Sequence, residues 1–231
     1  MANYLEMPYD SAFDFGTDEF AIIGWLKQAA NTAVETILER DSATTAQRFT
    51  LAVNASGFLT FTCDDDTTAR TATSNRAVDN DVWTQFVALY DGAGDVKIYL
   101  DGALDDTETG SALLTLNNAS AVLRVGLAVD GAEPLTNGSL ALLRISATAP
   151  SDSQIAKIYE DERPLFQENA QATLYGTSDA VTALAHDPVT DLLHVGTSDG
   201  RSVFQGLRRV ENTTDAVGTA ISASNNLIVE E

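Results

Sequence analysis

The chain has 231 residues, of which 13 are Lys or Arg and 34 are Asp or Glu, so its formal net charge is −21. This acidity makes nucleic acid and anionic membranes poor partners, because binding to a phosphate backbone depends on Lys and Arg side chains. The hydrophobic fraction of 44% suffices for a sizeable core, the single Cys63 excludes an internal disulfide, and no apolar run is long enough for a transmembrane helix.

Short runs of Val, Ile, Leu, Phe and Thr follow one another along the chain, separated by clusters of Gly, Asn, Asp and Ser. Turn signals about every 8–12 residues are typical of an antiparallel sandwich or barrel. Turns are expected at residues 53–57, at residues 91–95 and at Asp101-Gly102, each of which joins two apolar runs. The predicted strands span residues 3–7, 20–27, 35–41, 48–54, 58–63, 71–75, 83–90, 96–100, 113–116, 121–127 and 139–146.

One helix is predicted after the last of these strands. Ser151 can cap it and Gln154 can reach back as the partner in a capping box, and Pro164 ends it. The polar segment 167–171 is typical of a linker. The sequence therefore predicts a domain at residues 1–166 and a small β-rich module at residues 167–231.

The C-terminal module contains a short internal repeat: YGTSD at residues 175–179 recurs as VGTSD at residues 195–199. Strands are predicted on either side of a turn-forming segment at residues 187–191, and a further strand later. These predicted strands span residues 181–186, 192–195 and 202–210.

Four segments together resemble the laminin-G-like branch of the concanavalin-A-like lectin/glucanase superfamily. They are FDFGTDEFAIIGWLK at 13–27, WTQFVALYDG at 83–92, VKIYLDG at 96–102, and the closing strand GSLALLRIS at 138–146 with its trailing helix. The resemblance implies an all-β fold: an antiparallel two-sheet jelly-roll sandwich with one short helix and a small C-terminal β module. Trp25 and Trp83, which stand in aliphatic runs, are expected inside it.

Residues 192–204 are similar to one blade edge of a β-propeller repeat. One blade cannot bury its own face, so this module has to pack against the sandwich, against copies of itself or against another protein. Laminin-G-like domains joined to such short modules resemble virion proteins of tailed bacteriophages. The resemblance implies a structural role in a phage particle.

Glucanases on this fold need two carboxylates on one face of a strand, as nucleophile and acid/base. The nearest candidate is ETILERD at residues 35–41, in which Glu35 and Glu39 are expected to share a face. The family's middle Asp is missing, and the apolar Ile37 takes its place on that face. We therefore expect no catalytic residues and no enzymatic activity.

Calcium is the only cofactor that the sequence suggests. Many relatives bind it through rim-loop oxygens, and Asp64, Asp65 and Asp66 form the densest acidic loop of the chain. The alternative is a solvated turn. His186 and His194 are expected to face each other across a hairpin, but no third zinc ligand is placed by the sequence, so surface packing is favoured there.

The favoured function is a non-enzymatic structural protein of a phage particle, either a head decoration or a fibre-like subunit. Residues 171–231 would drive homo-oligomerisation, with a trimer expected, and the sandwich would face outward toward other virion proteins and host or environmental glycans. The N-terminus lacks a signal peptide, so synthesis in the host cytoplasm is expected. The alternative is a soluble carbohydrate-binding lectin module using rim-loop Asp and Asn side chains and Tyr9, and a glycan hydrolase is the least favoured.

Overall fold

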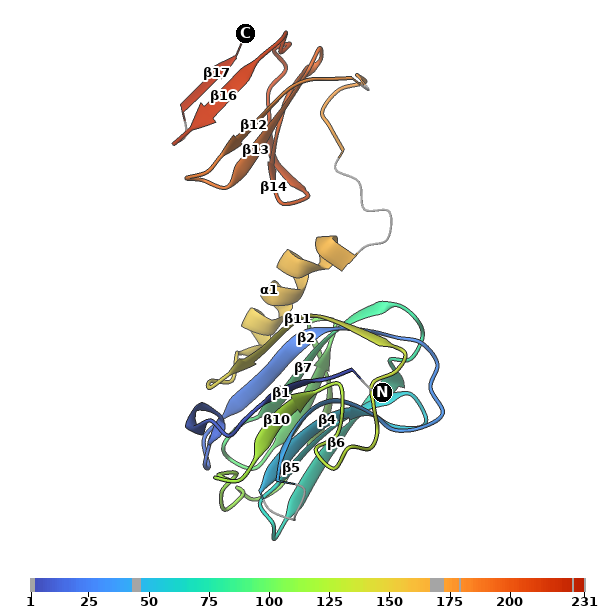
Figure 1. Ribbon diagram of the computed structural model, residues 1–231. Helices are drawn as coiled ribbons and strands as arrows, with labels where there is room; N and C mark the ends of the chain where they lie inside the picture. The colour runs from blue at the N-terminus through green and yellow to red at the C-terminus, as the bar shows by residue number, and fades with distance from the viewer. Residues whose placement is uncertain (1–2, 43–46, 167–172, 179, 226, 231) are drawn as a thin grey trace. The chain divides into compact units, whose positions relative to one another are not determined.

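The computed structural model describes residues 3–42, 47–166, 173–178, 180–225 and 227–230. The chain divides into two compact units, Met1–Asp161 and Glu162–Glu231. Figure 1 shows that the first unit contains two facing layers of strands and that the second is built from strands alone after the end of the helical segment. Each unit is described by itself below.

The N-terminal unit is a sandwich of two antiparallel sheets, as predicted. The larger sheet has the order β1-β10-β3-β4-β5-β6, with β1 (Leu5–Met7), β10 (Val122–Val125), β3 (Glu35–Asp41), β4 (Arg48–Val53), β5 (Phe58–Asp64) and β6 (Ala69–Ala77). The smaller has the order β11-β2-β7-β8-β9, with β11 (Gly138–Ser146), β2 (Phe20–Gln28), β7 (Trp83–Tyr90), β8 (Val96–Leu100) and β9 (Ala103–Glu108). A short 3-10 turn, η1 (Ser11–Phe13), precedes β2.

The core lies between the two sheets, because alternate residues of a strand point to the same face. Stacked and tilted aromatic rings fill one end of it: the centroids of Phe15 and Phe20 lie 4.4 Å apart, and those of Phe20 and Phe49 lie 5.0 Å apart. Burying each such side chain contributes about 1.5–3 kcal/mol. The remaining fully buried members come from both sheets and include Ile22, Leu26, Ile37, Leu51, Val53, Phe61, Ala88, Tyr90 and Ile98.

The helix α1 (Asp152–Glu162) covers the outer face of the smaller sheet. Its predicted capping box is confirmed, since the backbone N–H of Ser151 donates to Gln154 Oε1 at 2.8 Å. Trp25 is buried, but it lies on this outer face and stacks on Tyr159 with ring centroids 5.8 Å apart. Trp83 is only partly buried, so its predicted place inside the sandwich is wrong. A 3-10 turn, η2 (Arg163–Phe166), follows the helix.

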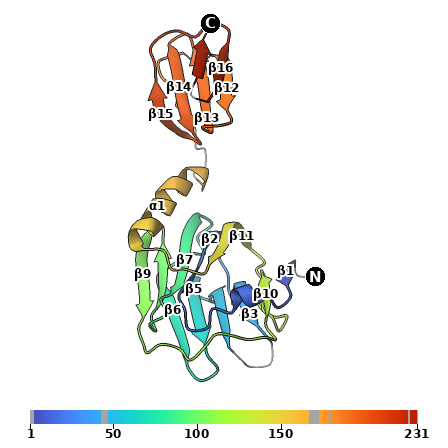
Figure 2. The ribbon, with the colours of Figure 1, turned by 90° about the vertical axis from the view of Figure 1, so that its left-hand side faces the viewer.

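In the N-terminal unit one predicted strand is absent and one observed strand is not predicted. Residues 113–116 form no strand, because their backbone N–H groups donate to other partners: Leu113 N to the Tyr90 hydroxyl at 3.0 Å and Leu114 N to Asp65 Oδ2 at 2.7 Å. Conversely, β9 was not predicted, because its sequence ALDDTE has no apolar alternation. It pairs with β8 and lies beside β6 (Figure 2).

Carboxylates of β9 bind the edge of the larger sheet. Asp106 Oδ2 accepts the backbone N–H of Thr73 at 3.0 Å, and Asp105 Oδ2 accepts that of Asn75. Both N–H groups belong to β6, the last strand of its sheet, so they have no neighbouring strand to bond. The acidic residues that break the apolar alternation of β9 therefore provide acceptors for two N–H groups at the edge of β6.

The C-terminal unit holds a four-stranded antiparallel sheet and a hairpin (Figure 2). The prediction of one strand over residues 202–210 is wrong, because a turn with Gly206 in the left-handed region (φ 59°) divides it. The hairpin strand β16 contacts β12 and β13, and it covers one face of the sheet near Gly196. The strands are β12 (Val181–Asp187), β13 (Leu192–Thr197), β14 (Gly200–Gln205), β15 (Arg208–Asn212), β16 (Ile221–Ser224) and β17 (Leu227–Glu230).

Candidate functional site

A β-bulge in β3 separates the two carboxylates of the glucanase-like segment. The pairing of β3 with β4 slips between Thr36 and Leu38, so Glu35 lies opposite Val53 whereas Glu39 lies opposite Thr50. Val53 and Thr50 are an odd number of residues apart on a regular strand and therefore face opposite sides of the sheet. The prediction that Glu35 and Glu39 share a face is thus wrong, and they cannot form a paired catalytic site across one face.

Glu39 instead anchors the loop that follows β10. Its Oε2 accepts the backbone N–H of Val129 at 2.5 Å, and its Oε1 accepts the hydroxyl of Thr50 at 3.0 Å. Burial raises the pKa of Glu39, because the charged form is disfavoured away from water, although these hydrogen bonds oppose the shift. The carboxylate of Glu39, which was a catalytic candidate by resemblance, therefore holds the loop at residues 126–137 in place.

Glu35 anchors the other end of the same loop. Glu35 is buried, and only 5% of the residue is exposed. Its two oxygens accept four hydrogen bonds, from Gln28 Nε2 (2.9 Å), Thr136 Oγ1 (2.8 Å), Thr136 N (3.1 Å) and Asn137 N (3.5 Å). The loop is therefore tied to β3 at both Glu35 and Glu39.

Further contacts fix the middle of the loop. Arg124 Nη1 donates to the carbonyls of Ala128 and Val129 at 2.9 and 2.7 Å, and Thr36 N donates to the carbonyl of Glu133 at 2.8 Å. Glu133 has a positive φ of 55°, a conformation that costs energy for a residue with a Cβ. These bonds tie the backbone of the loop to β10 and β3 at Ala128, Val129 and Glu133.

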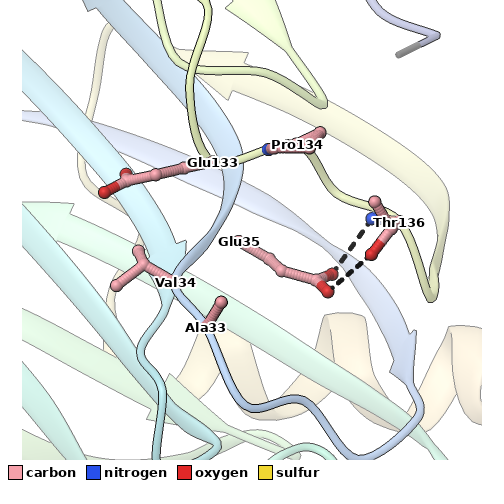
Figure 3. Close-up of a pocket in the computed structure, with 6 residues that line it drawn as sticks. All are labelled: Ala33, Val34, Glu35, Glu133, Pro134 and Thr136. Carbon is pink, nitrogen blue, oxygen red and sulfur yellow. Dashed lines mark hydrogen bonds between the residues drawn. The ribbon is translucent and has the colours of Figure 1, made fainter. Parts of the chain in front are cut away.

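A pocket with a volume of about 390 Å³ lies between this loop and the start of β3 (Figure 3). Its apolar walls come from Ala33, Val34 and Pro134. Glu35, Glu133 and Thr136 complete its lining, and Figure 3 shows the carboxylates of Glu35 and Glu133 pointing toward opposite ends. Its size falls within the range of about 300–1,000 Å³ that is usual for small-molecule pockets.

Sequence reasoning singled out only Glu35 among the residues of this pocket. The other lining residues are ordinary loop residues, and their convergence depends on the bulge and on the loop that Glu39 holds. Glu133-Pro134 within a Gly-containing loop was the only local signal, and it carries no chemical pattern of its own.

The acidic loop predicted to bind calcium uses its side chains differently. Asp65 is buried, and it accepts the backbone N–H groups of Thr67 (2.8 Å), Thr68 (2.7 Å) and Leu114 (2.7 Å). Asp64 pairs with Arg48 at 3.3 Å and accepts the N–H of Asp66, whose own side chain is exposed. The three carboxylates therefore do not converge on one point.

The remaining candidates are also dispersed. His186 lies opposite Leu193 and His194 lies opposite Ala185, so the two histidines occupy opposite faces of their sheet and the predicted pairing is wrong. Tyr9 is exposed, but its hydroxyl donates to Asp14 Oδ2 at 2.7 Å. Within the described ranges, no three His, Cys, Asp or Glu side chains are placed to hold a metal ion. Nor does that part of the chain contain a helix able to cross a membrane.

Solved structures share this fold at low sequence identity. A heptameric SAP-like pentraxin from Limulus polyphemus matches with a TM-score of 0.50 and 12% identity, over 68% of this chain and 81% of its own. A structure of botulinum neurotoxin type C, whose cell entry is dependent upon interaction with two ganglioside molecules, matches with a TM-score of 0.55 and 15% identity. The binding domain of botulinum neurotoxin DC in complex with SialylT matches with a TM-score of 0.54 and 14% identity.

Both toxin matches cover 94% of this chain, which spans about half (52%) of each toxin chain. At these identities the likeness shows the fold. No curated protein matches the sequence. The sequence profile described as "Concanavalin A-like lectin/glucanases superfamily" matches residues 2–156. This match covers more than half of the chain and nearly all of the sandwich, and the protein therefore belongs to the concanavalin A-like lectin/glucanase superfamily.

Proposed function

We propose that the sandwich is a non-catalytic domain that binds carbohydrate in the pocket between residues 33–36 and 133–136. The observation that carries the proposal is the use of Glu35 and Glu39: the bulge in β3 parts them, and both hold the pocket loop. The fold neighbours, which include toxin binding domains and a pentraxin, support a binding role over a hydrolytic one.

The pocket has the two kinds of surface that sugars require. The methyl groups of Ala33 and Val34 and the ring of Pro134 offer an apolar wall for the C–H face of a sugar ring. The carboxylate of Glu133 offers oxygen acceptors for hydroxyl groups, and the loop is already held in place, so little ordering is needed on binding. A compact, open pocket of about 390 Å³, rather than a long groove, favours the terminal residue of a glycan.

A glycan array followed by calorimetry tests the proposal. Wild-type protein should bind a subset of glycans, and Ala33→Tyr should abolish that binding by filling the pocket. Ala93→Tyr is the matched control, because Ala93 is exposed in the β7–β8 turn, beyond the end of β2 opposite to the pocket. Retention of binding by Ala33→Tyr, or no binding by wild type, would count against a glycan site in this pocket.

We further propose that the C-terminal unit assembles copies of the chain, as a decoration or fibre-like subunit of a phage virion would require. Its exposed apolar side chains support this role: Leu227 is 74% exposed, and Val229, on the same side of β17, is 62% exposed. A second copy of the chain is the occupant that we propose for this surface, and a trimer is the expected assembly.

Light scattering measures the mass of the proposed assembly directly. Wild-type protein should have the mass of a trimer, and Leu227→Ser combined with Val229→Ser should give a monomer. Leu104→Ser is the control, because Leu104 is 53% exposed on β9 of the sandwich. A monomeric wild type at all concentrations would remove the assembly proposal and leave the glycan proposal standing.

A further inference from the structure

The carboxylate of Glu35 is buried without a positive partner. Its four hydrogen-bond donors are two backbone amides, a side-chain amide and a hydroxyl, all of them neutral. In the described part of the chain, no Lys or Arg forms an ion pair with Glu35 or with Glu133. Burial away from water is costly for an ion without a partner of opposite sign, so a positively charged ligand would stabilise this carboxylate.

Asp14, a partly buried carboxylate of the sandwich, shows how a cation within the fold can match such a group. Asp14 forms an ion pair with Arg40, whose side chain is 2% exposed and also donates to the carbonyls of Leu116 and Asn118. Asp14 is thus neutralised from within the fold. Glu35 differs, because it lines an open pocket and its counter-charge can come from a ligand.

The second carboxylate of the pocket stands at the other end of the apolar wall. Glu133 is exposed, and Thr36 Oγ1 donates to its Oε2 at 3.3 Å, which leaves its other oxygen for a ligand. Figure 3 shows Ala33, Val34 and Pro134 between the two carboxylates. A ligand with an apolar ring and a positively charged donor meets an acidic group at either end of this pocket.

We propose that the pocket selects ligands bearing a primary ammonium group on an apolar ring face, and therefore amino sugars with a free amine over N-acetylated or acidic sugars. The choice of sugar class rests on the proposed glycan-binding function, whereas the preference for ammonium follows from the two carboxylates. The net charge of −21 adds a long-range attraction for cations, and this part weakens as salt rises.

Two matched pairs of probes test the inference by backbone amide NMR on the full chain. The first pair is cyclohexylammonium and cyclohexanol, and the second is an oligomer of glucosamine and its N-acetylated counterpart of equal length. We expect the ammonium member of each pair to bind about tenfold more tightly, the effect of roughly one charge-assisted contact. The shifts should centre on residues 33–36 and 133–137.

Glu133→Gln should reduce the preference for ammonium several-fold, because the amide keeps the shape and one acceptor but loses the charge. Glu108→Gln removes an exposed charge from β9 and should leave the preference unchanged. Equal binding within both pairs, shifts spread over the acidic surface, or an equal loss in both variants would overturn the inference.

The outcomes also separate the inference from the proposed function. If glycans bind in the pocket but the acetylated oligomer binds as well as the free amine, the ammonium preference fails and carbohydrate binding stands. If cyclohexylammonium binds in the pocket while no sugar binds, carbohydrate binding fails and the ammonium preference stands.

Discussion

The strand β3 and the loop at residues 64–66 both carry several acidic residues, and the two regions use them differently. In both, buried carboxylates accept backbone N–H groups and tie distant segments together. Both carboxylate oxygens of Asp65 are used in this way, to hold the backbone at Thr67, Thr68 and Leu114. Glu35 uses its oxygens similarly but lines a pocket of about 390 Å³. The comparison teaches that burial and hydrogen bonding alone do not make an acidic residue a candidate binding group, and that the pocket beside Glu35 is what does so there.

The largest expected effect tests whether Asp65 stabilises the fold through its hydrogen bonds to the backbone. Asp65→Ala should lower the free energy of unfolding by about 2–4 kcal/mol, because three backbone N–H groups lose their acceptor. Urea unfolding measures the change. Asp66→Asn should change stability by less than about 0.5 kcal/mol, because the side chain of Asp66 is exposed. Equal losses in the two variants would mean that the loop acts through its charge and not through Asp65.

The pH dependence should sharpen the contrast between the two regions. Burial disfavours the charged form of Asp65, but hydrogen bonds from Leu114, Thr68 and Thr67 outweigh it and lower the pKa of this carboxyl. Its contribution to stability is therefore present above the unfolded pKa of about 3.9 and is lost as pH falls through the lower folded value. The stability difference between wild type and Asp65→Asn should shrink from pH 7 to pH 2.5 in urea unfolding.

Glu39 should show the opposite slope, because burial raises its pKa. The favourable contribution of Glu39 to folding stability is present below the unfolded pKa of about 4.3 and is lost as pH rises through the higher folded pKa. The advantage of wild type over Glu39→Gln should therefore decrease between pH 4 and pH 7. The same slope for Asp65 and Glu39 would contradict the distinction between a hydrogen-bonded and a desolvated carboxylate.

The smallest expected effect concerns the pocket itself. Thr136→Val keeps the shape of the side chain but removes the 2.8 Å hydrogen bond to Glu35 Oε1, which should cost about 1 kcal/mol of unfolding free energy. Thr107→Val, on the strand β9, should be close to neutral, because β-branched residues suit strands. Thermal unfolding of both variants compares them, and an unchanged midpoint for Thr136→Val would mean that Glu35 is held by its other donors.

Much of the sandwich could be predicted from sequence because β2, β7 and β8 carry long apolar runs between strong turns. The helix was predictable because Ser151 and Gln154 form a local capping box. The pocket was not predictable, since it depends on the bulge at Ile37, and a bulge is defined by the partner strand as well as by its own. The role of Asp65 was hidden for the same reason, because its acceptor oxygen meets Leu114 from a distant part of the chain.

The carboxylates of Asp105 and Asp106 on β9 also bear on how copies of the chain meet. An unpaired edge strand invites a foreign strand to add to the sheet, which is a common route to runaway fibre growth. Here the N–H groups of Thr73 and Asn75 are already bonded to carboxylates, so a strand that paired with β6 at these positions would have to displace both side chains. On this side the sandwich can be crowded against its copies at high density without growing into a continuous sheet.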